Sequence, residues 1–305
     1  MTTDAVTLST PRSTLTIEPR GGCVATGWRV DGTEVLSLPA PLETFLASAR
    51  TGGIPLLYPW ANRLRGDRFT AAGRTVDLSK VPDLKRDGNG LPMHGLLLRW
   101  KAWHLGRHGT AGLEARLDWR EHDALMRAWP FPHTLRLSWQ LRDEGAGAFL
   151  DVNTRIDADG GCDVPVAFGW HPYVAVPSVT GSRLTLPSRQ PLPLDARGLP
   201  DASQPRPAPL PAGEVPCCHG DDALFERIDA GRGSAIVHLT RRRVRLDMGR
   251  EYPFMQLYSP ASASAGVACI EPMTAATSAL VDGTAPTVPD GGSFRASFTL
   301  SVSEG

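Results

Sequence analysis

A histidine followed by a proline and flanked by aromatic residues stands in the stretch GWHPYV, residues 169 to 174. His171 could exchange protons near neutral pH, because the ordinary pKa of a histidine is about 6.5. Pro172 stiffens the chain behind it, and Trp170 and Tyr173 offer aromatic surfaces. A histidine considered alone is more often part of a hydrogen-bonded core edge than of a reaction centre. The stretch therefore needs a partner before it indicates chemistry.

A carboxylate that could be this partner follows an apolar run near the C-terminus. Glu271 comes directly after VACI and before Pro272. A carboxylate at the end of a buried strand is either held in an ion pair or used in chemistry, and the residues themselves favour neither reading. With an ordinary pKa of about 4.3, a glutamate is ionised at neutral pH and can accept a proton. A modest rise of that pKa by burial would suit a general base.

Three further stretches place polar side chains beside turns or strand ends. Asn62 and Arg63 lie in YPWANRLRGDRF, His94 lies in LPMHGLLLRW, and Asp222 lies in HGDDALFE. Each of them could be an ordinary surface turn or loop residue. A planar guanidinium can also bind two neighbouring hydroxyl groups.

The order of these motifs resembles that of the aldose 1-epimerase family, the mutarotases of the galactose mutarotase-like group. The resemblance rests on the Asn-Arg pair, the His-Gly pair, Gly-x-His-Pro-Tyr and Glu-Pro-Met-Thr, which spread over about residues 52 to 275. Each motif is weak by itself, whereas four in the same order are specific. The resemblance implies a large antiparallel β-sandwich, the galactose mutarotase-like supersandwich. It also implies an enzyme that interconverts the α and β anomers of a free aldose.

The resemblance also assigns roles to the matching residues. It implies that His171 is the general acid that protonates the ring oxygen and that Glu271 is the general base on the anomeric hydroxyl. The other matches are implied to contact the substrate: Asn62, Arg63, His94, Asp222, Trp170 and Tyr173. The family uses no metal and no cofactor in this reaction, so we expect neither here.

Some positions need a choice or depart from the family's pattern. Asp222 stands three positions before Phe225, which is the family's spacing, so we prefer it to its neighbour Asp221. Val174 stands where the family often has a second aromatic residue. Residues 275 to 278 replace a stretch that is commonly rich in proline. These departures indicate a pocket unlike that of the best-known galactose enzymes.

The expected chemistry follows from the structure of the substrate. A cyclic aldose is a hemiacetal, and its ring opens when the anomeric hydroxyl loses a proton and the ring oxygen gains one. Glu271 and His171 could do both and exchange roles as the ring closes on the other carbonyl face. Each transfer contributes about 10²–10⁴-fold, so the pair needs no covalent step. His171 must be protonated in the acid role, and we expect a nearby carboxylate to raise its pKa.

Two other functions stay open at this point. Asp222 and Glu271 could be the carboxylates of a glycosidase, which would lie about 5 to 9.5 Å apart. A non-catalytic sugar-binding sandwich would need the arginine and the aromatic residues but no acid–base pair, so the presence of His171 counts against it. The sugar itself is not identified: galactose, glucose, arabinose, xylose, a sugar acid and a phosphorylated hexose are all compatible.

Between the motifs, apolar and polar residues alternate with period two. Residues 134 to 143 show this clearly, with Leu135, Leu137, Trp139 and Leu141 separated by polar neighbours. The same alternation recurs in residues 113 to 119, 244 to 248 and 294 to 302. It is typical of strands with one face on a core and the other in water. Asp31-Gly32, between two apolar arms, predicts a β-hairpin.

Helical signals are few. Residues 121 to 129 could form about two turns before Pro130 ends them. The sequence shows no regular alternation of strands and helices, so it does not indicate a parallel sheet. Residues 187 to 216 carry nine prolines and predict a surface loop with short extended pieces. Because alternating strands continue after that loop, we expect one all-β domain over residues 1–305, a large antiparallel β-sandwich.

Composition excludes several classes of partner. The 305 residues contain 32 basic and 32 acidic side chains, and a formal net charge of zero does not favour nucleic acid. No apolar run approaches the roughly 18 residues of a membrane span, and the N-terminus lacks the pattern of a secretory signal. We therefore expect no nucleic-acid or membrane partner. The resemblance implies a monosaccharide substrate, and we expect a monomer or homodimer.

Five cysteines occur without any CxxC spacing. An odd number of cysteines without the spacing of a disulfide framework indicates free thiols in a reducing compartment. We therefore expect a cytoplasmic protein. Cys217-Cys218-His219 looks like a metal motif, but adjacent cysteines reach one tetrahedral zinc with difficulty and no second ligand pair follows. We expect no metal there.

Overall fold

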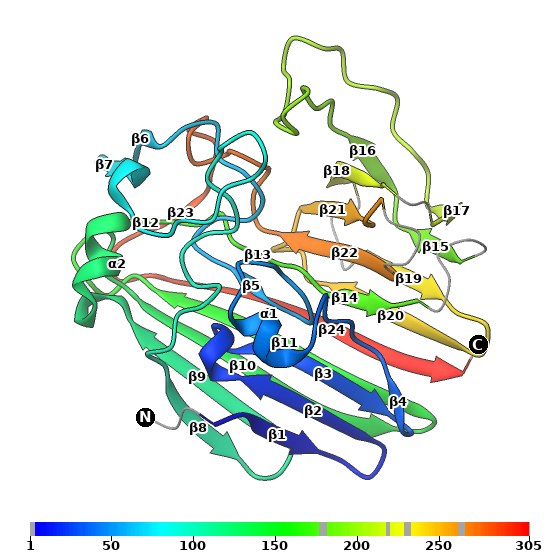
Figure 1. Ribbon diagram of the computed structural model, residues 1–305. Helices are drawn as coiled ribbons and strands as arrows, with labels where there is room; N and C mark the ends of the chain where they lie inside the picture. The colour runs from blue at the N-terminus through cyan, green and yellow to red at the C-terminus, as the bar shows by residue number, and fades with distance from the viewer. Residues whose placement is uncertain (1–3, 177–181, 218–219, 229–232, 262–265, 305) are drawn as a thin grey trace.

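The computed structural model describes residues 4–176, 182–217, 220–228, 233–261 and 266–304. Most of its regular structure is β, in three larger sheets and two two-stranded ribbons (Figure 1). Neighbouring strands within them pair antiparallel, as in the register Leu137↔Ala115. The predicted all-β, antiparallel architecture is confirmed. None of the helices in these residues has the length and apolar character that crossing a membrane would require.

The largest sheet has nine strands and forms the lower layer in Figure 1. Its long central strands explain the alternation in the sequence, because their inward side chains are apolar and their outward ones are polar. Its strands, in spatial order, are β17 (Gly213–Pro216), β15 (Arg183–Leu186), β19 (Gly233–His238), β20 (Arg242–Met248), β24 (Ser293–Glu304), β11 (Gly147–Asp157), β10 (Thr134–Glu144), β9 (Gly112–Asp118) and β8 (His104–His108).

A seven-stranded sheet lies over part of this layer. It is made of short strands, and its β22 is buried along its whole length, which fits a strand covered on both faces. The order is β16 (Arg189–Pro191), β18 (Asp222–Arg227), β21 (Phe254–Tyr258), β22 (Val267–Met273), β13 (Gly169–Trp170) and β5 (Leu56–Leu57), with β14 (Tyr173–Ala175) also paired to β22.

The remaining elements are small. A four-stranded sheet has the order β1 (Val6–Ser9), β2 (Ser13–Glu18), β3 (Val24–Val30) and β4 (Thr33–Glu34). The ribbons pair β6 (Arg68–Ala71) with β7 (Arg74–Asp77) and β12 (Val164–Pro165) with β23 (Thr287–Val288). The helices are α1 (Leu42–Leu46) and α2 (Asp123–Ala128), with 3₁₀ turns η1 (Pro19–Gly21), η2 (Leu78–Lys80) and η3 (Trp119–Glu121).

The core lies between the sheets and is rich in tryptophan. The Trp170 ring of β13 meets the Trp139 ring of β10 at 6.3 Å and the Phe298 ring of β24 at 5.8 Å, both edge to face. Edge-to-face packing is the favoured geometry for such rings. These contacts join the seven-stranded sheet to the nine-stranded one, and they hold the strands that carry the predicted site residues.

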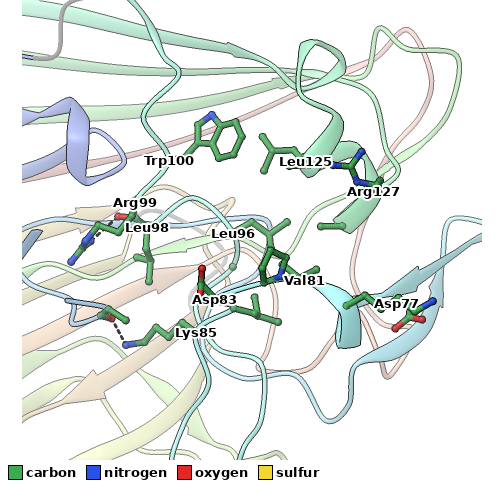
Figure 2. Close-up of a pocket in the computed structure, with 17 residues that line it drawn as sticks. Asp77, Val81, Asp83, Lys85, Leu96, Leu98, Arg99, Trp100, Leu125 and Arg127 are labelled. Carbon is green, nitrogen blue, oxygen red and sulfur yellow. Dashed lines mark hydrogen bonds between the residues drawn. The ribbon is translucent and has the colours of Figure 1, made fainter. Parts of the chain in front are cut away.

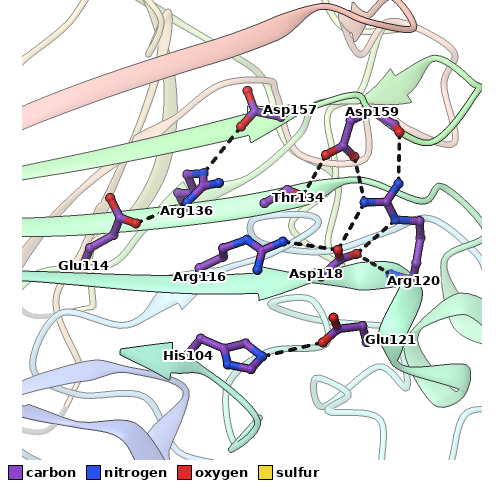
Figure 3. Close-up of polar contacts among 10 residues, drawn as sticks. All are labelled: His104, Glu114, Arg116, Asp118, Arg120, Glu121, Thr134, Arg136, Asp157 and Asp159. Carbon is purple, nitrogen blue, oxygen red and sulfur yellow. Dashed lines mark hydrogen bonds and ion pairs between the residues drawn. The ribbon is translucent and has the colours of Figure 1, made fainter. Parts of the chain in front are cut away.

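The outer face of the large sheet carries ion pairs instead of apolar side chains (Figure 3). Arg136 of β10 contacts Glu114 at 3.2 Å and Asp157 at 3.6 Å across the neighbouring strands. His104 and Glu121 form a 3.6 Å contact near the edge, with both side chains about half exposed. Exposed pairs of this kind add little stability, so their main effect is to keep this face compatible with water.

Smaller features predicted from the sequence are also confirmed. Asp31 and Gly32 have φ values of 48° and 76° and join β3 to β4, as a two-residue hairpin turn requires. The predicted helical turns appear as η3 and α2, and α2 ends before Pro130. In the proline-rich stretch, the segment from residue 202 to residue 214 is exposed.

Candidate active site

The register of β22 explains why His171 and Glu271 meet. Gly169 pairs with Met273 on one side of the gap between β13 and β14, and Tyr173 pairs with Cys269 on the other side. Continuing this register through the gap places His171 directly opposite Glu271. Directly opposed residues of an antiparallel pair point to the same face of the sheet. The acid–base pair is therefore a cross-strand pair of the seven-stranded sheet.

The two side chains are in contact and almost fully buried. Nε2 of His171 lies 3.2 Å from Oε1 of Glu271, and the residues are 3% and 2% exposed. The hydroxyl of Tyr173 lies 3.1 Å from the same Nε2 and 2.6 Å from Oγ1 of Thr51. The Tyr173 ring also stacks on the imidazole at 4.2 Å. These contacts fix the orientation of the imidazole and direct Nε2 toward the carboxyl group.

Burial dominates the electrostatics of this pair. Burial, with a smaller contribution from the positive charge of Lys85, lowers the pKa of His171 to about 3. Burial also raises the pKa of Glu271 well above its usual value, and Asp222 adds to this while Arg63 opposes it. Between these two pKa values the pair holds one proton, as a neutral imidazole beside a protonated carboxyl group.

This result corrects the expectation that a nearby carboxylate would raise the pKa of His171. Burial raises the pKa of the neighbouring carboxyl group and so favours its protonated form, which offers no negative charge to stabilise an imidazolium. If these two residues act as acid and base, a proton has to pass from Glu271 to His171 first.

His94 and Asn62 are held in unusual backbone conformations. Their φ values are 63° and 53°, in the left-handed region that most residues avoid. The amide of His94 donates to the carbonyl of Asn62 at 2.9 Å, which ties the two loops together. Gly95 follows with φ 74° and lies so close to Tyr58 that a Cβ would come within 2.1 Å of its carbonyl oxygen. Both side chains are buried at the cavity.

Arg63 is held by a network of polar side chains. Its Nε donates to Asp87 at 2.9 Å, and its Nη1 donates to Oδ1 of Asn62 at 2.9 Å. Its Nη2 contacts Asp222 at 3.4 Å. Gln256 bridges the same groups, because it accepts from Asn62 at 3.3 Å and donates to Asp222. This network arranges donors and acceptors along one wall, which suits the hydroxyl groups of a sugar.

Gln256 and Thr51 are residues of this wall that the sequence analysis missed. Gln256 pairs with Glu271 in the register of β21 and β22, so its side chain lies on the same face as the acid–base pair. The signal was available in the stretch FMQLY, where one polar residue interrupts an apolar strand. Thr51 stands in an ordinary-looking loop, and only its contact with Tyr173 connects it to the site.

The structure brings these residues around one cavity of about 590 Å³. That volume falls within the range of small-molecule sites. Seven of the predicted site residues line it: Asn62, Arg63, His94, His171, Tyr173, Asp222 and Glu271. Its other lining residues are Ser37, Leu38, Pro39, Arg50, Thr51, Lys85, Met93, Gln256, Tyr258, Pro260 and Val267.

Trp170 is the predicted site residue that lies elsewhere. Its side chain is fully buried in the core, and its Nε1 donates to Oγ1 of Thr154 at 3.0 Å. Adjacent residues of an extended strand point to opposite faces, so Trp170 faces the core where His171 faces the cavity. Val174 is directed away from the cavity for the same reason and packs in the core. We therefore leave Trp170 out of the site, and Val174 does not shape the cavity wall.

A larger cavity of about 770 Å³ lies beside α2 and η2 (Figure 2). It is lined largely by apolar residues, among them Leu96, Trp100 and Leu125. It shares only Lys85 with the first cavity and contains no pair of contacting acid and base side chains. The residues predicted from the sequence to carry the chemistry therefore line the smaller cavity.

The side chains that could bind a metal are dispersed in the part of the chain that the structure describes. Within residues 4–304, leaving out the undescribed gaps, no three His, Cys, Asp or Glu side chains gather as a metal site would need. Cys218 and His219, part of the motif discounted above, lie outside the described residues.

Known proteins resemble this chain in sequence family and in fold. The family model for aldose 1-epimerase matches residues 4–297. A galactose mutarotase-like protein from Clostridium acetobutylicum has a similar structure, with 20% identity, a TM-score of 0.79, and coverage of 98% of this chain and 95% of its own. No match to this sequence was found among curated proteins.

Two proteins from Lactobacillus acidophilus have the same fold. A galactose mutarotase related enzyme is 16% identical, with a TM-score of 0.77 and coverage of 99% of this chain and 97% of its own. A galactose 1-epimerase is 14% identical, with a TM-score of 0.70 and coverage of 98% and 94%. At such identities the likeness shows the fold, which confirms the predicted galactose mutarotase-like sandwich.

Proposed function

The chain belongs to the aldose 1-epimerase family, and on that basis we propose that Glu271 and His171 perform its acid–base chemistry. The protein is an isomerase that interconverts the α and β anomers of an aldose. The observation that carries the assignment of residues is the 3.2 Å contact between His171 Nε2 and Glu271 Oε1 inside a polar cavity. The anomeric hydroxyl and the ring oxygen of an aldose are bonded to one carbon, so two adjacent side chains can reach both.

The proton steps balance within the pair. A proton first moves from Glu271 to His171 across their contact, which creates a carboxylate and an imidazolium. The carboxylate then accepts the proton of the anomeric hydroxyl while the imidazolium protonates the ring oxygen, and the C1–O5 bond breaks. The pair is neutral again when the sugar is in its open form. Rotation about C1–C2 and the reverse transfers close the ring to the other anomer.

The remaining cavity residues would bind the sugar hydroxyls. Arg63 offers donors whose direction is fixed by Asp87, and Asp222 and Gln256 offer acceptors and donors beside it. His94 is buried, and burial lowers its pKa well below the usual value, so it stays neutral. A neutral imidazole can donate or accept one hydrogen bond without adding charge.

The test is exchange NMR of α/β interconversion over a panel of aldoses. Glu271→Gln and His171→Asn should each lower kcat/KM at least about 10²-fold, the usual contribution of one positioned proton transfer. A matched control exists on the outer face, where His104 and Glu121 form an exposed pair (Figure 3). Glu121→Gln and His104→Asn should keep wild-type rates. If both cavity variants kept wild-type activity, the assignment of Glu271 and His171 as base and acid would be wrong.

A glycosidase reaction is the alternative for the same cavity. It would use Asp222 and Glu271 as its two carboxylates, and both line the cavity. Asp222 is already bound by Arg63 and Gln256, which supports a positioning role for it instead. Release of reducing sugar from an aryl glycoside would favour the glycosidase. Sugar binding without any rate enhancement would favour a non-catalytic sandwich.

We also propose a single domain, a cytoplasmic location, and a monomer or homodimer. The family match across residues 4–297 supports one domain. Cys23, Cys162 and Cys269 have free thiols, which supports a reducing compartment. Limited proteolysis, fractionation and light scattering test these three statements separately.

A further inference from the structure

Three cations gather on one side of the sugar cavity without a carboxylate partner among the described residues. Lys85 donates to the carbonyl of Ala49 at 2.6 Å, and Arg99 donates to the carbonyl of Arg50 at 2.7 Å. Arg50 donates to the carbonyl of Pro39 at 3.4 Å. Figure 2 shows Lys85 and Arg99 where they line the larger neighbouring cavity. Backbone carbonyls satisfy hydrogen bonds, but they do not balance three positive charges.

Arg63, which also lines the cavity, is different. Arg63 contacts two carboxylates, Asp87 at 2.9 Å and Asp222 at 3.4 Å, so its charge is matched by the protein. The cavity therefore has an arginine whose charge is matched by carboxylates and, elsewhere on its lining, two cations without one. Lys85 and Arg99 are half-buried and Arg50 is exposed, and a group of unpaired cations of this kind is complementary to an anion from outside.

Two of the three cations reach the cavity itself. Lys85 and Arg50 both line it, together with His171 and Glu271, whereas Arg99 lies behind them. Arg50 precedes Thr51, which binds the hydroxyl of Tyr173, so this cationic wall borders the acid–base pair directly. A sugar that places its anomeric carbon at Glu271 and His171 would have its other end close to the positive charges of Lys85 and Arg50.

We propose that the substrate is an aldose that carries an anionic group, a phosphate monoester or a carboxylate, on a carbon other than the anomeric one, and that Lys85 and Arg50 bind this group. The inference deepens the proposed function and rests on it. Both anions share the chemistry that the wall recognises, which is a compact negative charge with several acceptor oxygens. A neutral aldose would leave the cations unbalanced.

Electrostatics at the acid support the same substrate class. Lys85 is one cause of the low pKa of His171, after burial. The charged and titratable groups that face the imidazole are Glu271, Tyr173, Tyr258, His94 and Lys85. An anion on Lys85 would cancel the one positive charge in this set and make protonation of His171 easier. The substrate's own charge would then assist the acid that protonates its ring oxygen.

The experiment compares matched sugars and matched variants. Exchange NMR gives kcat/KM, corrected for the uncatalysed rate, for glucose, glucose 6-phosphate and glucuronate. The Lys85→Gln and Arg50→Gln variants are measured beside Lys85→Arg, which keeps the charge. Lys80→Gln is the control, because Lys80 lies on the larger cavity only. Circular dichroism of each variant checks that it is folded.

The wild type should prefer one or both anionic sugars to glucose. Lys85→Gln and Arg50→Gln should each reduce that preference about 10- to 100-fold, as expected for a lost hydrogen bond to a charged group. Lys85→Arg and Lys80→Gln should keep it. Preference for the phosphate, the carboxylate or both identifies the source of the anion.

Two results would overturn the inference. One is a wild type that converts glucose as well as the anionic sugars. The other is a pair of variants that lose activity on all three sugars equally. In both cases anomer interconversion still occurs and depends on Glu271, so the proposed function would stand. If none of the sugars were converted faster than in buffer, the proposed function itself would fail.

Discussion

Nε2 of His171 lies 3.2 Å from Oε1 of Glu271, and no more than 3% of either residue is exposed. The two residues come from opposed positions of paired strands, so a sheet register sets their separation. A rigid sheet fixes such a distance better than two flexible loops would. Because burial pushes the two pKa values apart in opposite directions, the pair is organised to hold a single proton.

The pH dependence of catalysis should report this shared proton. The active form carries one proton on the pair, so kcat/KM should rise as pH increases through about 3, the pKa of His171, and fall above the raised pKa of Glu271. A broad plateau between them is expected. Rate measurements in overlapping acid and alkaline buffers check this. An acid limb near pH 6.5, the ordinary value for histidine, would contradict the buried pair.

Asp87 should act on substrate binding through Arg63. Asp87→Asn keeps the shape of the side chain but removes the charge that holds Arg63 Nε at 2.9 Å. We expect KM for the aldose to rise about 10- to 100-fold with a smaller change in kcat, since the guanidinium is misplaced but the acid–base pair is intact. Asp67→Asn is the control, because Asp67 makes the same 2.9 Å contact with Arg86 at the surface. Equal effects of both variants would contradict the role of Asp87.

Gly95 should be indispensable for the loop that carries His94. A Cβ at this position would lie 2.1 Å from the carbonyl oxygen of Tyr58, and φ is 74°. Gly95→Ala should lower the free energy of unfolding by about 3 kcal/mol or more, from strain and overpacking together. Gly90→Ala has a similar φ of 78° with nothing within 4 Å, so it should cost only about 1–2 kcal/mol. Urea unfolding of the two variants gives the comparison.

His133 should make the fold sensitive to acid. Its side chain is fully buried. Its Nε2 lies 2.6 Å from the hydroxyl of Tyr58, and its Nδ1 lies 2.6 Å from the carbonyl oxygen of Phe131. Burial lowers its pKa to about 4, so the unfolded chain binds a proton between about pH 6.5 and pH 4 that the folded protein does not. Stability should therefore fall as the pH falls through this window, by up to about 3 kcal/mol from this residue.

The measurement for His133 is the slope of unfolding free energy against pH. His133→Gln should be less stable than the wild type at neutral pH, because it loses the stacking of the imidazole on Trp119 at 4.8 Å. It should also lose less stability than the wild type on acidification. His108→Gln is the control on the exposed strand β8, and its slope should match the wild type. A wild-type slope in His133→Gln would contradict the argument.

Much of the fold could be predicted because its causes are local. The alternation of Leu135, Leu137 and Trp139 with polar residues follows from the two faces of a strand, and β10 has that burial pattern. Asp31-Gly32 requires two left-handed conformations, and few residue pairs other than Asn-Gly and Asp-Gly allow them. The order of a few short motifs along the chain was enough to identify the family, because each motif lies within one stretch of sequence.

The amino-acid sequence by itself determined the all-β class, the family and the residues that could act as acid and base. Only the tertiary structure decided how they are used. The register of β22 set His171 against Glu271 and added Gln256 to the same face, while it directed Trp170 into the core. Burial then lowered the pKa of His171 and raised that of Glu271, the reverse of the shifts expected for a neighbouring ion pair in water. Register and solvent exclusion depend on chain segments far apart in sequence, and no local pattern records them.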